Sequence, residues 1–251
     1  MEGRSGTIRA LNDLQWSNAI SLGRERGVLD TNGRTVTAGG TISGQGLLAV
    51  TGGGTLNIRR ENTYAGGTVI TGSGALRRAS GTRVVLGEGG ERGLGAGLVT
   101  LQGGSLLELA FSDKTFFNRL AGTAAETVLV SGRGVTLDAD NSAFAGTWEI
   151  TGGALAAGTL RDAASPDHVL NNLGTGSSIF LNGGELTLSG TNAEDADLLF
   201  ANKLSGNGIL HAVLGTQDSR FFFDADRAPA AGNSFTGTLD MKNGTYVFST
   251  A

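Results

Sequence analysis

Short runs of alternating apolar and polar residues dominate the chain, and clusters of Gly, Asn, Asp and Ser separate them. Because successive side chains of a β-strand point to opposite faces, each run predicts a short strand with one buried face. Many runs are only three to five residues long, which is short for a β-sandwich and typical of the faces of a coiled solenoid. The predicted strands include 34–37, 47–50, 55–58, 98–101, 128–130, 135–137, 179–181 and 185–188.

Helical periodicity is nearly absent. Two short helices are predicted, at Thr115–Leu120 and at Ala163–Asn171, and the second opens with the cap-like sequence Ser165-Pro166-Asp167. The rest of the pattern favours an all-β fold.

One sequence pattern occurs three times along the chain. It reads NTYAGGTVITGSGAL from Asn62, and looser copies read NSAFAGTWEITGGAL from Asn141 and NSFTGTLDMKNGTY from Asn233. The intervals are 141 − 62 = 79 and 233 − 141 = 92 residues, so each would hold about three to four units of ~20–30 residues. Because the intervals differ, loops of different length are expected to leave the coil.

The three copies align on an aromatic residue and on the Gly two positions later. In the strand that follows, the first and third residues are expected to face the core. The middle residue, which is Val69, Glu149 or Asp240, is expected to face water because two of the three are carboxylates. The repeat positions expected to specify the coil are Asn62, Tyr64, Gly66, Gly67, Thr68, Ile70, Leu76, Asn141, Phe144, Gly146, Ile150, Asn233, Phe235, Gly237 and Met241.

The composition fits a β-solenoid, since the 251 residues include 43 Gly and only 2 Pro. Corners between short strands often need a positive φ, which Gly adopts most easily and Asn next, whereas Pro removes a donor from the strand ladder. Stacked rungs bury inward residues, and each Ile-sized side chain contributes about 1.5–3 kcal/mol, so disulfides are not needed. No linker divides the chain, so one unit is predicted over 16–251, with 1–15 left unassigned.

The first copy, N-T-Y-x-G-G-T-x-I-x-x-G-x-G-x-L, follows V-x-G-G-G-T-L-x-I and resembles the passenger-associated repeat of bacterial autotransporters, the type V secretion proteins. The resemblance is sharp over 28–110 and looser over 128–160 and 174–249. It implies a right-handed, single-stranded parallel β-helix with loop excursions. It also implies export to the bacterial cell surface through an outer-membrane β-barrel that continues the native chain. Partners implied are host-surface or matrix molecules, or the same passenger on neighbouring cells.

Charge and Cys content narrow the class of protein further. Charged residues make up 17% of the chain and its net charge is −4, which argues against a nucleic-acid partner. The chain has no Cys, which excludes disulfides, thiolate metal sites and thiol catalysis. No apolar run reaches the ~18 residues of a membrane helix. The start lacks a signal peptide and the end reads as an uncapped strand, so we expect a fragment of a longer chain.

Residues that could carry out catalysis are few, and we expect no enzyme activity and no cofactor. His168 and His211 are the only imidazoles, and no Gly-Asp-Ser-Gly motif accompanies them. A polysaccharide-active β-helix enzyme or a weak calcium site stays open as an alternative, because carboxylates recur and i,i+2 pairs share a strand face. These carboxylates are Asp138, Asp140, Glu194, Asp195, Asp197, Asp224 and Asp226.

The run Phe221-Phe222-Phe223 cannot bury all three rings in a strand, because alternation turns at least one of them outward. We predict a loop or short helix packed over the coil, with an interaction patch as the alternative. Arg59-Arg60 and Arg77-Arg78 are interpreted as solvated charges, with contact to an anionic glycan as the alternative.

The favoured hypothesis is a surface-exposed, non-enzymatic stalk that acts in adhesion or self-association. A rigid spacer that aids export and display ranks second, and a polysaccharide-active enzyme ranks third. Specific binding is expected in the segments between copies of the repeat.

Overall fold

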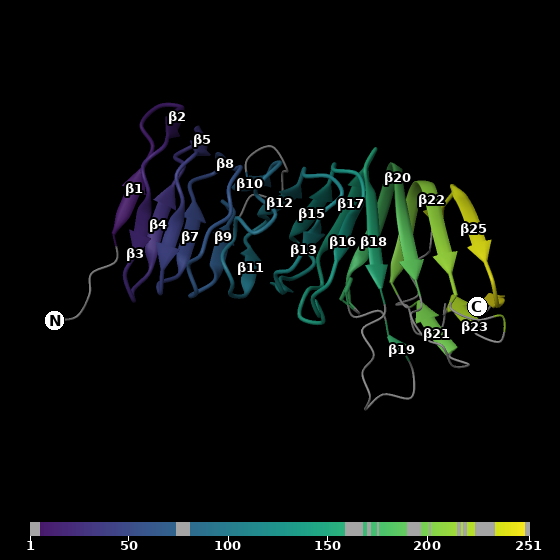
Figure 1. Cartoon of the computed structure of the whole chain (residues 1–251). Coiled ribbons are helices and arrows are strands. Elements are labelled where there is room, and N and C mark those ends of the chain that lie inside the picture. The colour runs from purple at the N-terminus through teal and green to yellow at the C-terminus, as the bar shows by residue number, and fades with distance from the viewer. Residues whose placement is uncertain are drawn as a thin grey trace.

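The computed structural model describes residues 6–73, 81–158, 168–169, 172–174, 176–189, 197–200, 202–214, 217, 220–223 and 234–248. None of these residues lies in a helix. Each named strand is parallel to the strands with which it pairs. The strands stack in chain order from the N-terminal to the C-terminal end of an elongated molecule (Figure 1). The predicted all-β parallel solenoid is therefore confirmed.

Strands of successive rungs form rows, and three of these rows carry most of the structure. The six-stranded sheet consists of β1 (Thr7–Arg9), β4 (Gly27–Asp30), β7 (Leu48–Thr51), β9 (Thr68–Thr71), β11 (Val99–Gln102) and β14 (Leu120–Ala121). The fourteen-stranded sheet contains two rows. Its long row consists of β2 (Leu14–Trp16), β5 (Thr35–Ala38), β8 (Thr55–Ile58), β10 (Arg83–Leu86), β12 (Leu106–Leu109), β15 (Thr127–Val130), β17 (Thr147–Thr151) and the first parts of β20 (Ser178–Ser189) and β22 (Lys203–Val213).

The late row of the same sheet begins about halfway along the molecule. It consists of β13 (Thr115–Phe116), β16 (Val135–Leu137), β18 (Ala154–Gly158), the second parts of β20 and β22, and β25 (Thr238–Lys242). β24 (Ser234–Phe235) pairs with β22. A two-stranded sheet holds β3 (Ile20–Leu22) and β6 (Ile42–Gly44), and a four-stranded sheet holds β19 (His168–Val169), β21 (Asp197–Phe200), β23 (Arg220–Phe223) and β26 (Thr245–Phe248).

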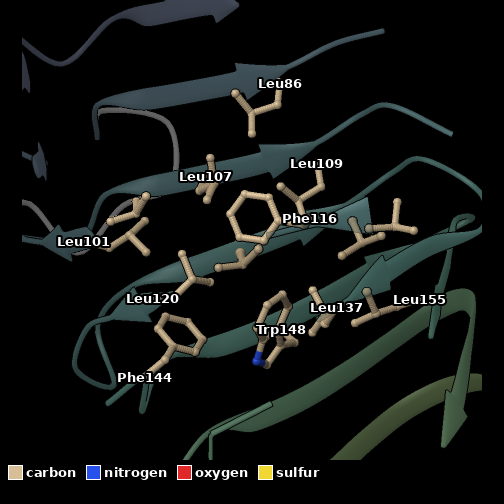
Figure 2. Packing of buried hydrophobic residues seen from close by; sticks show 14 of the residues in the cluster. Leu86, Leu101, Leu107, Leu109, Phe116, Leu120, Leu137, Phe144, Trp148 and Leu155 are labelled. Atoms are coloured by element: carbon tan, nitrogen blue, oxygen red, sulfur yellow. The ribbon is translucent and has the colours of Figure 1, made fainter. Parts of the chain in front are cut away.

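The core consists of columns of apolar side chains that stack in register from rung to rung. Strand alternation turns every second residue inward, and parallel pairing without offset places these residues above one another. One column of the long row contains Val36, Leu56, Val84, Leu107, Val128, Trp148, Ile179 and Leu204, all buried. Figure 2 shows the middle of this core, where Leu107 and Trp148 lie among Leu and Phe side chains from neighbouring rows.

Most predicted strands are found within one residue of their expected bounds. The strands 55–58 and 135–137 coincide with β8 and β16. The strands 179–181 and 185–188 were expected to be separate, but both lie in the single strand β20, whose register shifts between Asn182 and Glu185. β1 and β2 extend the coil into the segment 1–15 that the sequence pattern left unassigned.

The predicted helix at Thr115–Leu120 is wrong. This segment contains β13 and the start of β14, and Phe116 is fully buried opposite Leu137 of the next rung. A single helical turn would have withdrawn this ring from the core column. Of the second predicted helix, only His168 and Val169 are described, and they form β19. The other residues of that prediction lie outside the described ranges.

Candidate functional site

The Asn that opens each of the first two copies of the repeat is buried and joins three successive rungs. Asn62 Oδ1 accepts the backbone N–H of Ile42 at 2.7 Å, and its Nδ2 donates to the carbonyl of Gly93 at 2.6 Å. Asn141 does the same with the N–H of Leu120 at 2.8 Å and the carbonyl of Asn172 at 2.6 Å. One amide side chain therefore satisfies a donor about twenty residues earlier and an acceptor about thirty residues later.

The aromatic residue of the repeat and the residue four positions later form a second contact between rungs. The hydroxyls of Tyr64 and Thr68 lie 2.5 Å apart, and Thr68 Oγ1 donates to the carbonyl of Leu94 at 3.0 Å. Burial raises the pKa of Tyr64, which keeps this phenol protonated and able to donate. The second copy replaces the pair by an aromatic one.

In that second copy, Phe144 and Trp148 pack edge to face with ring centroids 5.4 Å apart. Trp148 Nε1 donates to the carbonyl of Leu173 at 2.8 Å, as Thr68 does to Leu94. The two rings are labelled in Figure 2, where they lie near each other. The two copies thus reach the same type of acceptor with different side chains.

The Gly two positions after the aromatic residue of each copy is required because backbone atoms of a neighbouring rung lie close to it. A Cβ on Gly66 would collide with the carbonyl carbon of Gly46 on the preceding rung. A Cβ on Gly146 would lie 2.6 Å from the carbonyl oxygen of Glu126, and one on Gly237 would collide with the backbone of Gly208. Gly67 needs its freedom for a second reason, since its φ is +85°.

A further repeat signal was missed in the sequence. The carbonyls that accept from Thr68 and Trp148 belong to Leu-Gly-x-Gly sequences at 94–97 and 173–176. Each Leu follows its Asn by the same interval, since 94 − 62 = 32 and 173 − 141 = 32. The Leu of this second motif supplies the acceptor for the first motif, and a search for paired motifs at constant spacing would have found it.

The third copy is more exposed than the first two. Phe235 and Leu239 are only partly buried, and Met241, expected to be in the core, is 42% exposed. Met241 does stand in the inward column of the late row, opposite Ala212, but no described strand covers its other side. Asn233 and Leu76 lie outside the described residues.

The middle residue of the repeat strand is not exposed to solvent in every copy. Val69 and Asp240 are partly exposed, as expected, but Glu149 is 9% exposed. The prediction of a solvated Glu149 is wrong because its neighbours in register on the outer face are Leu129 and Phe180, whose bulk shields it.

One outward column of the long row is rich in hydroxyl groups. This column contains Thr35, Thr55, Arg83, Leu106, Thr127, Thr147, Ser178 and Lys203. Five of these eight positions are Thr or Ser. We refer to these eight positions as the hydroxyl column. Arg83 of this column forms an ion pair with Glu108, which belongs to the neighbouring outward column. Glu108 also accepts a hydrogen bond from Ser131 Oγ at 2.7 Å.

The three Phe side chains lie in a strand and not in a loop or helix. In β23, Phe221 is buried and Phe223 packs against the core, where it contacts the rings of Phe200 and Phe221. Phe222 alternates to the other face, with the Arg220 guanidinium 5.4 Å from its ring centroid. The run therefore offers one ring, not three, to a partner.

The acidic candidates do not assemble into a catalytic groove. Asp138 and Asp140 follow β16 in a turn, not on a strand face as expected, and Asp140 Oδ1 accepts the N–H of Ser142 at 2.9 Å. No group of metal-ligating side chains among the described residues is placed to hold an ion. Candidates outside the described side chains are Glu194, Asp195, Asp197, Asp224, Asp226 and His168.

His211 lies on the outer face of the late row between two carboxylates. Its Nδ1 is 2.8 Å from Asp240 Oδ2, and its Nε2 is 3.6 Å from Glu185 Oε2. The hydrogen bond with His211, together with the Lys242 charge, lowers the pKa of Asp240. No Ser, Thr or Cys nucleophile is bonded to His211 in the described part of the chain. The cluster joins three rungs through the contacts of His211 with Asp240 and Glu185, and Lys242 Nζ lies 3.5 Å from Asp240 Oδ2.

Comparison with protein-family models, with curated proteins and with solved structures finds no match to this chain. Within the described ranges, no helix has the length and apolar character needed to cross a membrane.

Proposed function

We propose that the chain is part of an autotransporter passenger, displayed on the bacterial cell surface, where it acts as a β-solenoid stalk in adhesion or self-association. The observation that carries this proposal is the hydroxyl column on the outer face of the long row. Thr35 and Thr55 are adjacent in this column, and so are Thr127, Thr147 and Ser178, with Arg83 and Leu106 between the two groups. Hydroxyls on neighbouring strands, about 4.8 Å apart, can make weak hydrogen bonds with a second extended surface.

The repeat contributes to the proposal through its structural role. Asn62 and Asn141 direct their side chains into the coil, and the aromatic residues that follow are buried. The residues that carry the resemblance are therefore occupied in holding rungs together. Binding is left to outward residues, which belong to the strand faces and the segments between the copies.

A cell-aggregation assay tests the proposal. The chain would be displayed on bacteria within an exported passenger, and settling and binding to epithelium or matrix would be compared with cells lacking it. The double variant Thr127→Lys, Thr147→Lys places two charges side by side on the hydroxyl column and should reduce settling or binding. The matched control Val69→Lys, Thr100→Lys places two charges side by side on the outer face of the six-stranded sheet and should settle and bind like the parent.

Two results would contradict the proposal. One is display without any gain in aggregation or binding over cells lacking the chain. The other is an equal loss in the test and control variants, since general charge repulsion would then explain the effect. The first result would favour the rigid spacer, whose deletion shortens the passenger without removing a binding activity.

A polysaccharide-active enzyme is less well supported. Asp138 is exposed and Asp140 is engaged in its own turn, and neither lines a described cavity. Incubation with uronic-acid and neutral glycans in the presence of calcium, followed by analysis for cleaved or unsaturated products, would test this alternative.

A further inference from the structure

A recess of about 360 Å³ opens on the outer face of the long row, where β8, β10 and β12 end. It lies in the middle of the coil, with strands on either side of it in the sheet. Its lining residues are Asn57, Arg59, Val85, Gly87, Glu88 and Ala110. The hydroxyl column is a separate feature of the same face.

The recess results from small residues at one outward position. Register places Arg59, Gly87 and Ala110 directly after the aligned strand ends on three successive rungs. Gly87 has no side chain and Ala110 has only a methyl group, so the sheet is uncovered there. A Cβ on Gly87 would lie 3.4 Å from Arg59 Cγ and 3.7 Å from its Nε, so the Arg59 side chain forms the wall of the hollow.

The polar groups at the rim are free to bind. Arg59 is exposed and makes no ion pair or hydrogen bond with a described residue, and the same holds for the side-chain amide of Asn57. Glu88 is held in place because its Oε1 accepts the backbone N–H of Ser112 at 2.8 Å.

Two other cations nearby, by contrast, are paired with carboxylates. Lys114 Nζ lies 3.2 Å from Glu91 Oε1, and Arg92 Nε lies 3.9 Å from Glu61 Oε1. Although burial by itself raises the pKa of Glu91, its backbone hydrogen bond and the charges of Lys114 and Arg92 lower it overall. Arg59 is thus the cation that lines the recess, and it has no ion pair with a described residue.

We propose that this recess binds one carboxylate-bearing sugar ring, a uronic acid residue of an acidic polysaccharide. The planar guanidinium of Arg59 matches a carboxylate through two parallel N–H···O bonds. Asn57 can donate to and accept from ring hydroxyls, and Glu88 can accept from them. Val85 and Ala110 supply an apolar floor for the C–H face of the ring.

The size of the recess agrees with this class of ligand. Its volume lies at the low end of the range of about 300–1,000 Å³ found for small-molecule sites, which suits a single ring better than a long chain. The net charge of −4 makes strong nonspecific attraction of polyanions unfavourable, so binding should depend on this local Arg. The site does not depend on self-association of the protein.

Titration of the isotope-labelled chain with methyl β-D-glucuronide, followed through the backbone amide signals of Gly87 and Glu88, tests the proposal. Methyl β-D-glucoside, which lacks the carboxylate, is the matched neutral probe. We expect saturable shifts with the glucuronide, with a Kd of about 1 mM, and at least about tenfold weaker binding of the glucoside.

Three variants separate the site from general effects. Arg59→Gln should weaken glucuronide binding about tenfold or more, whereas its neighbour Arg60→Gln, outside the recess, should leave it unchanged. Gly87→Leu should abolish binding by filling the hollow, since Gly87 does not require a positive φ. If Gly87→Leu does not fold, the comparison of Arg59→Gln with Arg60→Gln tests the site by itself.

The proposal is overturned if the amide signals do not shift up to about 10 mM glucuronide. It is equally overturned if both sugars bind alike, or if Arg59→Gln and Arg60→Gln have the same effect. Binding by a chain that fails the cell-aggregation test would support the recess and count only against the proposed self-association.

Discussion

Replacement of Asn141 by Ala is the most direct test of how this coil is held together. The Asn141 side chain is fully buried at the corner between the late row, where β16 ends, and the six-stranded sheet, where Leu120 opens β14. The substitution leaves the backbone N–H of Leu120 and the carbonyl of Asn172 without their side-chain partner. It does not touch any outward residue, so surface binding should be affected only through folding.

The expected cost follows from two buried polar groups. An unsatisfied buried donor or acceptor costs about 1–3 kcal/mol, so two of them cost about 2–6 kcal/mol. The lower half of that range is the better estimate if water enters the corner and satisfies one group. Either value exceeds the change of about 0.5 kcal/mol that is typical of substitutions on an exposed surface.

Urea unfolding followed by circular dichroism would measure the change in the free energy of unfolding. Because a solenoid can lose rungs one at a time, hydrogen exchange at the Leu120 amide supplies a local readout that does not assume two states. Asn207→Ala, at an exposed position of β22, is the matched control and should unfold at the parent's urea concentration. An unchanged midpoint for Asn141→Ala together with unchanged protection of Leu120 would refute the reasoning.

Three more substitutions test the other contacts of the repeat, each by urea unfolding. Tyr64→Phe removes a buried hydroxyl contact and should cost about 0.5–1.5 kcal/mol near neutral pH. Because burial raises the pKa of Tyr64 above that of unfolded tyrosine, the parent should lose more stability than this variant as the pH rises above about 10; equal losses would contradict the assignment. Trp148→Phe leaves the Leu173 carbonyl unpaired and should cost at least about 1–3 kcal/mol, and a neutral effect would show that water replaces the indole. Gly66→Ala should destabilise strongly because its methyl group would overlap the neighbouring backbone, whereas Gly158→Ala, with open space around it, should not; similar midpoints for the two would exclude close approach as the cause.

Much of the fold followed from local features of the chain. The alternation in 55–58 and 135–137 predicted β8 and β16 with their bounds, and inward positions such as Ile70 and Ile150 are fully buried. Residue type alone was a poor guide at Thr115–Leu120, where a short polar-apolar mixture suggested a helix. There the next rung supplied Leu137 as a partner for Phe116, and the buried contact determined the strand.

The candidate site was less accessible from the sequence. The Arg59-Arg60 pair stood out, but nothing local distinguished Arg59, at the wall of a recess, from Arg60, outside it. That difference depends on Gly87 and Ala110, which lie on the following rungs. The paired Leu-Gly-x-Gly sequences, in contrast, could have been found from their constant spacing.

By itself the sequence determined which residues turn inward, which can form corners and that the chain repeats, because alternation and φ preferences are properties of single residues and their neighbours. Only the tertiary structure decided which groups meet across rungs. Asn62 bonds residues on both sides that are 20 and 31 positions away, and Glu149 is shielded by side chains of adjacent strands. In a solenoid each rung is completed by the rungs stacked on it, so burial and binding surfaces depend on contacts that no single stretch of sequence contains.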